Sequence, residues 1–118
     1  MDIVYIRELR ADTVIGVYDW ERKVRQTVVL DLELATDNRR AAASDRVEDA
    51  LDYAALSGRL LSFIEGSAFQ LIETLAERVA AIAIDEFGVP WLRLRLAKPG
   101  AVLRAGDVGV IIERGQRP

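Results

Sequence analysis

The chain has 118 residues, of which 51% are hydrophobic and 30% are charged, and its formal net charge is −3. This profile is typical of a single globular domain over residues 1–118 with one modest core. Cysteine and histidine are both absent, which excludes disulfides, thiolate chemistry, Cys/His zinc sites and every mechanism that uses imidazole as its base. Carboxylates, lysine and tyrosine remain for proton transfer.

The charge pattern also disfavours two kinds of partner. The chain is slightly acidic and its arginines are scattered, whereas nucleic-acid binding depends on a basic face. No apolar run approaches the ~20 residues of a membrane span, and the opening segment MDIVYIRELR carries charge where a signal peptide needs an apolar core. We therefore expect a cytoplasmic protein that binds neither nucleic acid nor membranes.

In chain order, the sequence begins with two predicted strands. Residues 3–17 are rich in β-branched side chains, and residues 27–34 (TVVLDLEL) alternate between apolar and other side chains. The connection over residues 18–26 is polar and long for a hairpin. Residues 37–52 are poor in large apolar side chains, and they allow only a short surface helix.

Two amphipathic helices and two more strands follow. Apolar residues recur at spacings of three and four from Tyr53 to Gly66 and again from Leu71 to Gly88. WLRLRLAK then alternates as a strand does, and VGVIIE after the KPG turn predicts the last strand. The order is ββααββ, which indicates an α+β fold with an antiparallel four-stranded sheet and two helices on one face.

The pattern of the strands also bears on assembly. Two helices cover one face of such a sheet, yet VGVIIE and IVYI carry apolar residues at both parities. A partner chain would cover the opposite face, and because edge strands need pairing, a closed β-barrel of several sheets would satisfy both requirements. We predict a homo-oligomer. The alternative is a monomer with a partly apolar outer face.

Lysine is rare enough here to suggest a chemical role. Lys23 and Lys98 are the only lysines among 16 basic residues. Lys98 shares its strand parity with Leu96 and not with Arg95, which directs it toward the covered face. Partial desolvation there would favour the neutral amine and allow proton transfer near neutrality, which arginine cannot perform. The alternative is a surface lysine that caps the turn at residues 99–100.

Three other side chains are candidates. Glu73 lies in the first turn of the second long helix, where a carboxylate could accept two parallel N–H bonds from a guanidine-like ligand edge, although the helix dipole favours a carboxylate there in any case. Tyr53 could be an acid and hydrogen-bond donor, or it could be a core aromatic residue whose hydroxyl contacts solvent. Glu21 lies in the first loop, where functional residues are common but most glutamates are solvated.

Several segments of the chain resemble a known family. MDIVYIREL, IGVYDWER, DNRRAAASD, DALDY, LIETLAERVA, RLAKPGAV and GVIIERG look like bacterial dihydroneopterin aldolases, in order and with matching spacing over essentially the whole chain. IGVYDWE and the KPGA turn are the most specific parts. The resemblance implies the tunnelling fold, which has the same ββααββ order, and assembly into four-subunit barrels that often stack in pairs as octamers.

The resemblance also implies a reaction. Members of this family split 7,8-dihydroneopterin into 6-hydroxymethyl-7,8-dihydropterin and glycolaldehyde by a retro-aldol step of folate biosynthesis. They use no metal, Schiff base or other cofactor, because the C=N bond of the pterin accepts the electrons released on cleavage. The absence of cysteine and histidine fits this chemistry. Epimerisation at the carbon that bears the 2′-hydroxyl is an implied side activity.

Residue by residue, the resemblance implies roles for three side chains and one backbone segment. Lys98 matches the lysine of the KPGA motif, a general acid/base that moves the proton of the 2′-hydroxyl. Glu73 matches the carboxylate that binds the 2-amino and N3 edge of the pterin, with the backbone of Ile72 beside it. Glu21 matches the loop glutamate near the hydroxylated tail of the substrate.

Two further residues are implied to come from a neighbouring subunit. Tyr53 matches a tyrosine that reaches the site from that subunit and helps to protonate the enol intermediate, and Leu51 would contribute backbone contacts only. The active site would then lie at a subunit interface, and a monomer would be inactive.

Two other interpretations stay open. A dihydroneopterin triphosphate 2′-epimerase would require a basic patch at the pocket mouth for three phosphates, and the sequence shows no obvious one. A non-catalytic pterin-binding relative would be expected to have lost Lys98, Tyr53 or Glu21 first, and all three are present.

Overall fold

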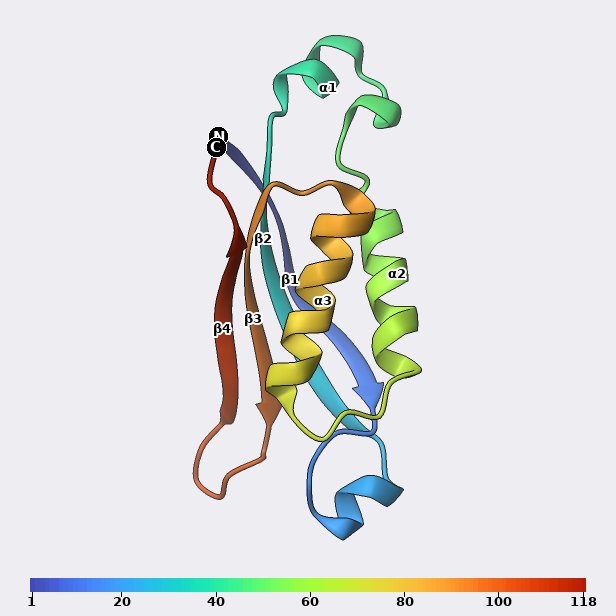
Figure 1. Cartoon of the computed structure of the whole chain (residues 1–118), viewed down its shortest axis with the longest axis vertical. Helices are drawn as coiled ribbons and strands as arrows, with labels where there is room; N and C mark the ends of the chain where they lie inside the picture. The colour runs from blue at the N-terminus through green and yellow to red at the C-terminus, as the bar shows by residue number, and fades with distance from the viewer.

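The computed structural model describes residues 1–118 and has a four-stranded antiparallel sheet covered on one face by two helices (Figure 1). The strands lie in the order β1-β2-β3-β4, and they span Asp2–Thr13 (β1), Gln26–Thr36 (β2), Trp91–Pro99 (β3) and Asp107–Gly115 (β4). The two covering helices are α2 (Tyr53–Glu65) and α3 (Ile72–Phe87). The predicted order and architecture of the chain are confirmed.

Three short elements lie in the connections. A 3-10 helix, η1 (Asp19–Lys23), joins β1 to β2, while α1 (Arg39–Ser44) and η2 (Val47–Asp49) lie between β2 and α2. The short surface helix predicted within residues 37–52 is therefore present. The prediction for the first strand was too long, because β1 ends at Thr13 and the chain turns at Gly16, where φ is +130°.

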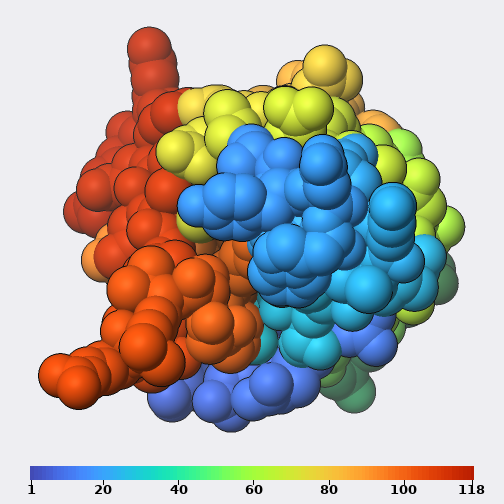
Figure 2. Space-filling model, turned by 90° about the horizontal axis from the view of Figure 1, so that it is seen from below, coloured from blue at the N-terminus to red at the C-terminus, as the bar shows by residue number.

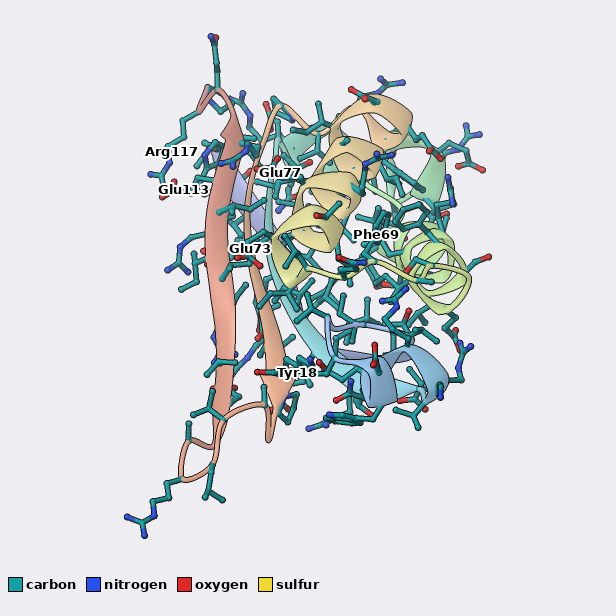
Figure 3. All side chains as sticks on the ribbon, turned by 60° about the horizontal axis from the view of Figure 1, so that its bottom comes forward. Tyr18, Phe69, Glu73, Glu77, Glu113 and Arg117 are labelled. Atoms are coloured by element: carbon teal, nitrogen blue, oxygen red, sulfur yellow. The ribbon has the colours of Figure 1, made fainter.

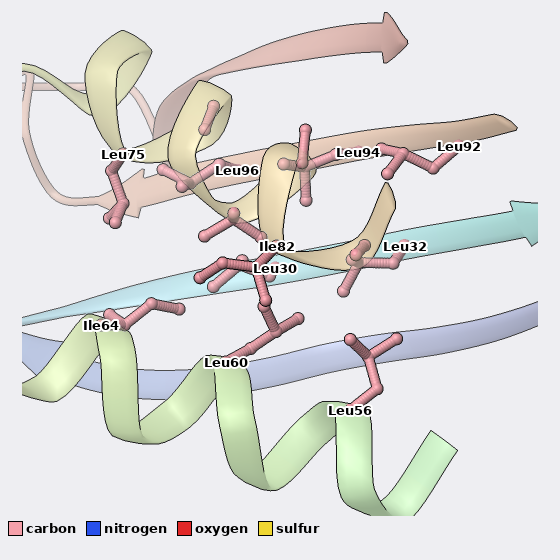
Figure 4. Close-up of a cluster of buried hydrophobic side chains, with 14 of the residues drawn as sticks. Leu30, Leu32, Leu56, Leu60, Ile64, Leu75, Ile82, Leu92, Leu94 and Leu96 are labelled. Carbon is pink, nitrogen blue, oxygen red and sulfur yellow. The ribbon is translucent and has the colours of Figure 1, made fainter. Parts of the chain in front are cut away.

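The core lies between the helices and the sheet (Figure 4). Leu56, Leu60 and Ile64 recur every four residues along α2, so all three point toward the strands. Leucines of β2 and β3 meet them from the other side, and 19 buried residues form one hydrophobic cluster. Full burial of each such side chain contributes about 1.5–3 kcal/mol, so this layer is what holds the helices on the sheet.

The opposite face of the sheet carries a group of charged side chains at its centre. Arg93 pairs with Glu33 across the β2–β3 ladder at 3.2 Å, and Arg95 pairs with Asp31 at 3.4 Å and with Asp107 at 3.1 Å. Tyr5 of β1 and Ile111 of β4 are exposed. The outer face thus combines charged side chains on the central strands β2 and β3 with exposed apolar side chains on the edge strands β1 and β4, where the sequence carries apolar residues at both parities.

The two ends of the sheet differ in what surrounds them (Figure 1). η1, the end of β3 and the start of α3 gather at one end, which we call the η1 end. α1, η2, the start of α2 and both chain termini lie at the opposite end, which we call the α1 end. The molecule is 52 Å long along this axis. No helix combines the length and the apolar character that crossing a membrane requires.

Candidate active site

The η1 end contains a buried lysine–glutamate pair. Lys98, near the end of β3, points to the helix-covered side, and its side chain is 12% exposed. Its Nζ donates a hydrogen bond to Oε2 of Glu21, which is 5% exposed although it belongs to a connection between strands. The parity prediction for Lys98 is confirmed. The alternative of a surface lysine that caps the turn is wrong, and Glu21 is buried, unlike most glutamates in loops.

The backbone and one amide side chain complete the surroundings of Glu21. Gln26 Nε2 donates to Glu21 Oε2 at 3.0 Å and to the carbonyl of Ile15 at 2.8 Å, and the amide of Tyr18 donates to Oε1 at 3.3 Å. These hydrogen bonds, that from Gln26 first and that from Lys98 second, lower the pKa of Glu21 although burial acts to raise it. Glu21 is therefore ionised at neutral pH and carries the charge opposite to a lysine ammonium.

A glycine makes this arrangement sterically feasible. Gly16 has φ of +130°, a conformation that residues with a side chain rarely adopt. A Cβ atom built there would lie 2.2 Å from the carboxyl carbon of Glu21. The carboxylate therefore occupies the space that any other residue at position 16 would fill. Sequence reasoning missed the contributions of Gly16 and Gln26, since neither carries a signal of its own.

The start of α3 lies at the same end. Glu73 is in the first turn of α3 and is exposed, and Ile72 beside it packs partly against the core. Figure 3 shows Glu73 on the side of α3 that faces β3 and β4, whereas Phe69 lies on the side of α2. The structure thus brings Glu21, Lys98, Ile72 and Glu73 to one end of the molecule, as the resemblance implied.

Tyr53 and Leu51 lie elsewhere. Tyr53 is the first residue of α2, at the α1 end, and is 61% exposed, while Leu51 is half-buried. They border a surface hollow of about 350 Å³ that Val47 and Ala54 also line. The 13 residues of α2 separate them from the η1 end, a distance of about 20 Å. A single chain therefore does not bring Tyr53 to Lys98.

A cavity of about 970 Å³ is also at the α1 end and is lined by residues near both termini together with Arg39, Asp49 and Leu51. Apart from Leu51, sequence reasoning singled out none of its residues. It contains neither Lys98 nor Glu73, so this cavity and the buried ion pair are at opposite ends. No group of three or more acidic side chains is close enough together to hold a metal ion.

Comparison with solved structures defines the class first. An archaeosine synthase QueF-like protein, only 14% identical, has the same fold, with a TM-score of 0.68 over 100% of this chain and 98% of that chain. The ββααββ order, the antiparallel sheet and the two helices on one face make this chain a tunnelling-fold protein, as predicted.

The family follows from closer relatives. A dihydroneopterin aldolase (FolB) family model matches residues 4–113. The dihydroneopterin aldolase of Escherichia coli K12 is 53% identical over 98% of this chain and 94% of its own length, and that of Haemophilus influenzae is 43% identical over 98% of each. The E. coli structure in complex with neopterin matches with a TM-score of 0.95, over 98% of this chain and 100% of that chain. The chain belongs to the dihydroneopterin aldolase family.

A relative with another activity is more distant. The dihydroneopterin triphosphate 2′-epimerase of E. coli K12 is 27% identical over 93% of this chain and 92% of its own length. The difference between 53% and 27% identity within one bacterium favours the aldolase group.

Proposed function

We propose that this chain is a dihydroneopterin aldolase, a lyase that cleaves 7,8-dihydroneopterin into 6-hydroxymethyl-7,8-dihydropterin and glycolaldehyde. The observation that carries the proposal is 53% identity to an E. coli dihydroneopterin aldolase over nearly the whole chain. The buried Lys98–Glu21 pair beside the start of α3 supports it, because it supplies an amine and a carboxylate in a partly desolvated setting.

Glu73 is the proposed anchor for the pterin ring. Its carboxylate is exposed at the first turn of α3, and the 2-amino group and N3–H of a pterin form the kind of double donor edge that a carboxylate accepts from. The backbone of Ile72 adds a contact beside it. The E. coli relative binds neopterin in its solved structure, which supports a pterin as the ligand class.

Lys98 is the proposed general acid/base. The proton of the 2′-hydroxyl leaves as the bond between C1′ and C2′ breaks, and the electron pair of that bond enters the C=N bond of the pterin. Glycolaldehyde departs, and protonation of C1′ in the resulting enol completes the hydroxymethyl product. Lys98 takes and returns protons in this sequence, and its Nζ is held in place by its hydrogen bond to Glu21.

A second copy of the chain is proposed to complete the site. Tyr53 is exposed and about 20 Å from the η1 end, so its proposed role in protonating the enol requires the Tyr53 of a neighbouring subunit. Leu51 would add backbone contacts from the same neighbour. The free edges of β1 and β4 support side-by-side pairing of sheets into a homo-oligomeric barrel, as a tetramer or an octamer.

The same site supports a second activity. If the retro-aldol step reverses with the other face of the aldehyde presented to the enol, the carbon that bears the 2′-hydroxyl is inverted, and dihydromonapterin forms. The 27% identical triphosphate epimerase shows that epimerisation occurs on a related chain. We propose epimerisation as a side activity, while epimerisation of the triphosphate as the main function and pterin binding without catalysis are the alternatives.

The test is to incubate the purified protein with 7,8-dihydroneopterin in the presence of a chelator and to separate the pterin products by chromatography. We expect 6-hydroxymethyl-7,8-dihydropterin with one equivalent of glycolaldehyde. Dihydromonapterin alone would identify an epimerase, and pterin binding without turnover would identify a non-catalytic relative. The cytoplasmic location expected from the sequence stays a prediction.

A further inference from the structure

Arg22 joins the two segments that carry the proposed site residues of the η1 end. It follows Glu21 directly in η1, and its guanidinium donates to three backbone carbonyls. Nη1 reaches the carbonyls of Gly16 at 3.0 Å and of Phe69 at 3.1 Å, and Nη2 reaches that of Ala68 at 2.6 Å. One side chain thus spans the β1–β2 connection and the segment between α2 and α3.

Two other polar links lie nearby. The hydroxyl of Thr13, the last residue of β1, donates to the carbonyl of Ser67 at 2.9 Å. The amide of Gly16 donates to the carbonyl of Phe69 at 3.4 Å, which is long for such a bond. Figure 2, which views the η1 end, shows the β1–β2 connection in blue against the yellow-green segment that leads into α3. The guanidinium of Arg22 is therefore the strongest polar contact between them, because its donors are charged and fan out to separate acceptors.

The two segments hold different parts of the proposed site. The β1–β2 connection carries Glu21, which faces Lys98, and the segment over residues 67–71 ends where α3 begins with Ile72 and Glu73. Glu21 keeps its own hydrogen bonds to Gln26 and Lys98 without Arg22. Loss of Arg22 would therefore leave each half intact and loosen only the placement of one half against the other.

We propose that Arg22 is a positioning residue that keeps the pterin-binding carboxylate of Glu73 in register with the Lys98–Glu21 pair. The inference rests on the proposed aldolase function, in which one substrate must touch both. A bound pterin ring would still reach Glu73 without Arg22, but its hydroxylated tail would meet Lys98 less often in a reactive geometry. Turnover is more sensitive to such misalignment than ring binding is.

Arg25 offers a matched control. Its Nη2 donates to the carbonyls of Asp12 at 3.0 Å and of Glu65 at 2.7 Å, so it ties the same connection to the end of α2. No proposed site residue lies at that end of α2. Arg25→Ala and Arg22→Ala therefore each remove the hydrogen bonds of one arginine of the β1–β2 connection to backbone carbonyls, and only Arg22 links the two halves of the site.

The experiment compares Arg22→Ala, Arg22→Gln and Arg25→Ala for kcat with 7,8-dihydroneopterin and for the Kd of 6-hydroxymethylpterin, which lacks the longer tail. We expect Arg22→Ala to lower kcat about tenfold, with the Kd changed less than threefold. Arg22→Gln retains two amide N–H donors and should lose less. Arg25→Ala should keep kcat within about threefold. Millimolar guanidinium ion should restore part of the kcat of Arg22→Ala, which a general loss of stability would not allow.

Several outcomes would overturn the inference. These are a kcat within threefold of the wild type in Arg22→Ala, an equal loss in Arg25→Ala, or a loss that lies wholly in the Kd. If Arg22→Ala does not fold, Arg22→Gln and Arg25→Ala give the same comparison. Wild-type protein that fails to cleave dihydroneopterin would overturn the proposed function itself, whereas an active wild type with an unaffected Arg22→Ala variant would overturn only the role of Arg22.

Discussion

The η1 end and the α1 end of this molecule differ in how much of a functional site each one completes by itself. At the η1 end, Glu21 and Lys98 are buried against each other, and every buried polar side-chain atom of the chain has a hydrogen-bond partner. At the α1 end, Tyr53 is exposed and Leu51 borders an open hollow. The comparison teaches that one chain brings together only part of the proposed site, and that the role proposed for Tyr53 and Leu51 requires a second copy of the chain.

The ion pairs of the two ends also differ in what they contribute. Arg39 pairs with Asp37 at the α1 end with both side chains largely exposed, and such pairs contribute about 0–1 kcal/mol. The Lys98–Glu21 pair is shielded from water, so removing one partner leaves a buried charge without compensation. We therefore expect substitutions at the η1 end to have the larger effects.

The largest expected effect is on turnover at the η1 end. Lys98→Ala should lower kcat by at least about a hundredfold and leave pterin binding nearly intact, because a general acid/base is lost while the ring anchor remains. Steady-state kinetics and pterin titration measure the two quantities. Lys23→Ala removes the only other lysine, which is exposed in η1, and should leave kcat unchanged. Unchanged turnover in Lys98→Ala would remove Lys98 from the mechanism.

Mixing two inactive variants tests whether the η1 end of one subunit lies against the α1 end of another. Lys98→Ala and Tyr53→Phe each remove one half of every site, so each homo-oligomer should be nearly inactive. After the two are unfolded together and refolded, random assembly should restore about a quarter of the sites, because each site takes its halves from different chains. Activity that stays at the level of the separate variants would mean that Tyr53 and Lys98 do not share a site across an interface.

Two glutamates on α3 allow the proposed pterin-binding role of the η1 end to be tested. Glu73→Ala should raise the Kd for neopterin at least about tenfold, because a bidentate carboxylate contact is lost. Glu77 lies one turn further along and pairs with Arg114 of β4 on the surface, so Glu77→Ala should leave the Kd within twofold. Fluorescence titration of both variants measures this, and wild-type affinity in Glu73→Ala would contradict the anchoring role.

Two glycines test how much the close contact between Gly16 and Glu21 constrains the fold at the η1 end. Gly16→Ala should destabilise the fold by about 1–3 kcal/mol, because its Cβ would overlap the carboxylate of Glu21 and its φ is positive. Gly58→Ala in α2 meets no atom within 4 Å and should stabilise by about 0.5–1 kcal/mol. Urea unfolding measures both. Equal stability of the two variants would show that the contact between Gly16 and Glu21 does not constrain the fold.

The smallest expected effect is a shift in acid stability. The pKa of Glu21 is lowered in the folded state, so its contribution to stability is complete above the unfolded-state pKa and is lost as the pH falls through the lowered value. Gln26→Leu removes the largest cause of the lowering, so the pKa of Glu21 should rise toward its unfolded value, its contribution to stability should shrink, and the acid unfolding midpoint should move to higher pH. Acid unfolding followed by circular dichroism measures the midpoint.

An exposed pair provides the control for that titration. Glu86 also has a lowered pKa, because Arg59 donates to it from α2. Both side chains are about half exposed, so water replaces the contact when Arg59 is changed. Arg59→Gln should therefore move the acid midpoint less than Gln26→Leu does. A larger shift in Arg59→Gln would mean that burial of Glu21 does not govern the acid limit.

Local pattern in the sequence was sufficient for the elements and for one catalytic candidate. Spacings of two and of three to four report which side chains face a core, so the strands, both long helices and the inward direction of Lys98 followed from the sequence alone. The family resemblance then named Glu21, Glu73 and Tyr53 by motif. The resemblance also implied that Tyr53 reaches the site from another subunit, but neither kind of reasoning showed where these residues lie within one chain.

Tertiary structure alone decided the rest. Lys98 donates a hydrogen bond to Glu21, which lies 77 positions earlier in the sequence. Arg22 donates to the carbonyls of two residues that lie 46 and 47 positions later. Contacts between residues so far apart in the sequence form only when the sheet and helices bring loops together. Loop sequences have no periodicity, so such contacts cannot be predicted from pattern. The burial of Glu21 comes from the β1–β2 connection folding onto Gln26 and Lys98, and the distance of Tyr53 from Lys98 is set by the packing of α2 along the sheet.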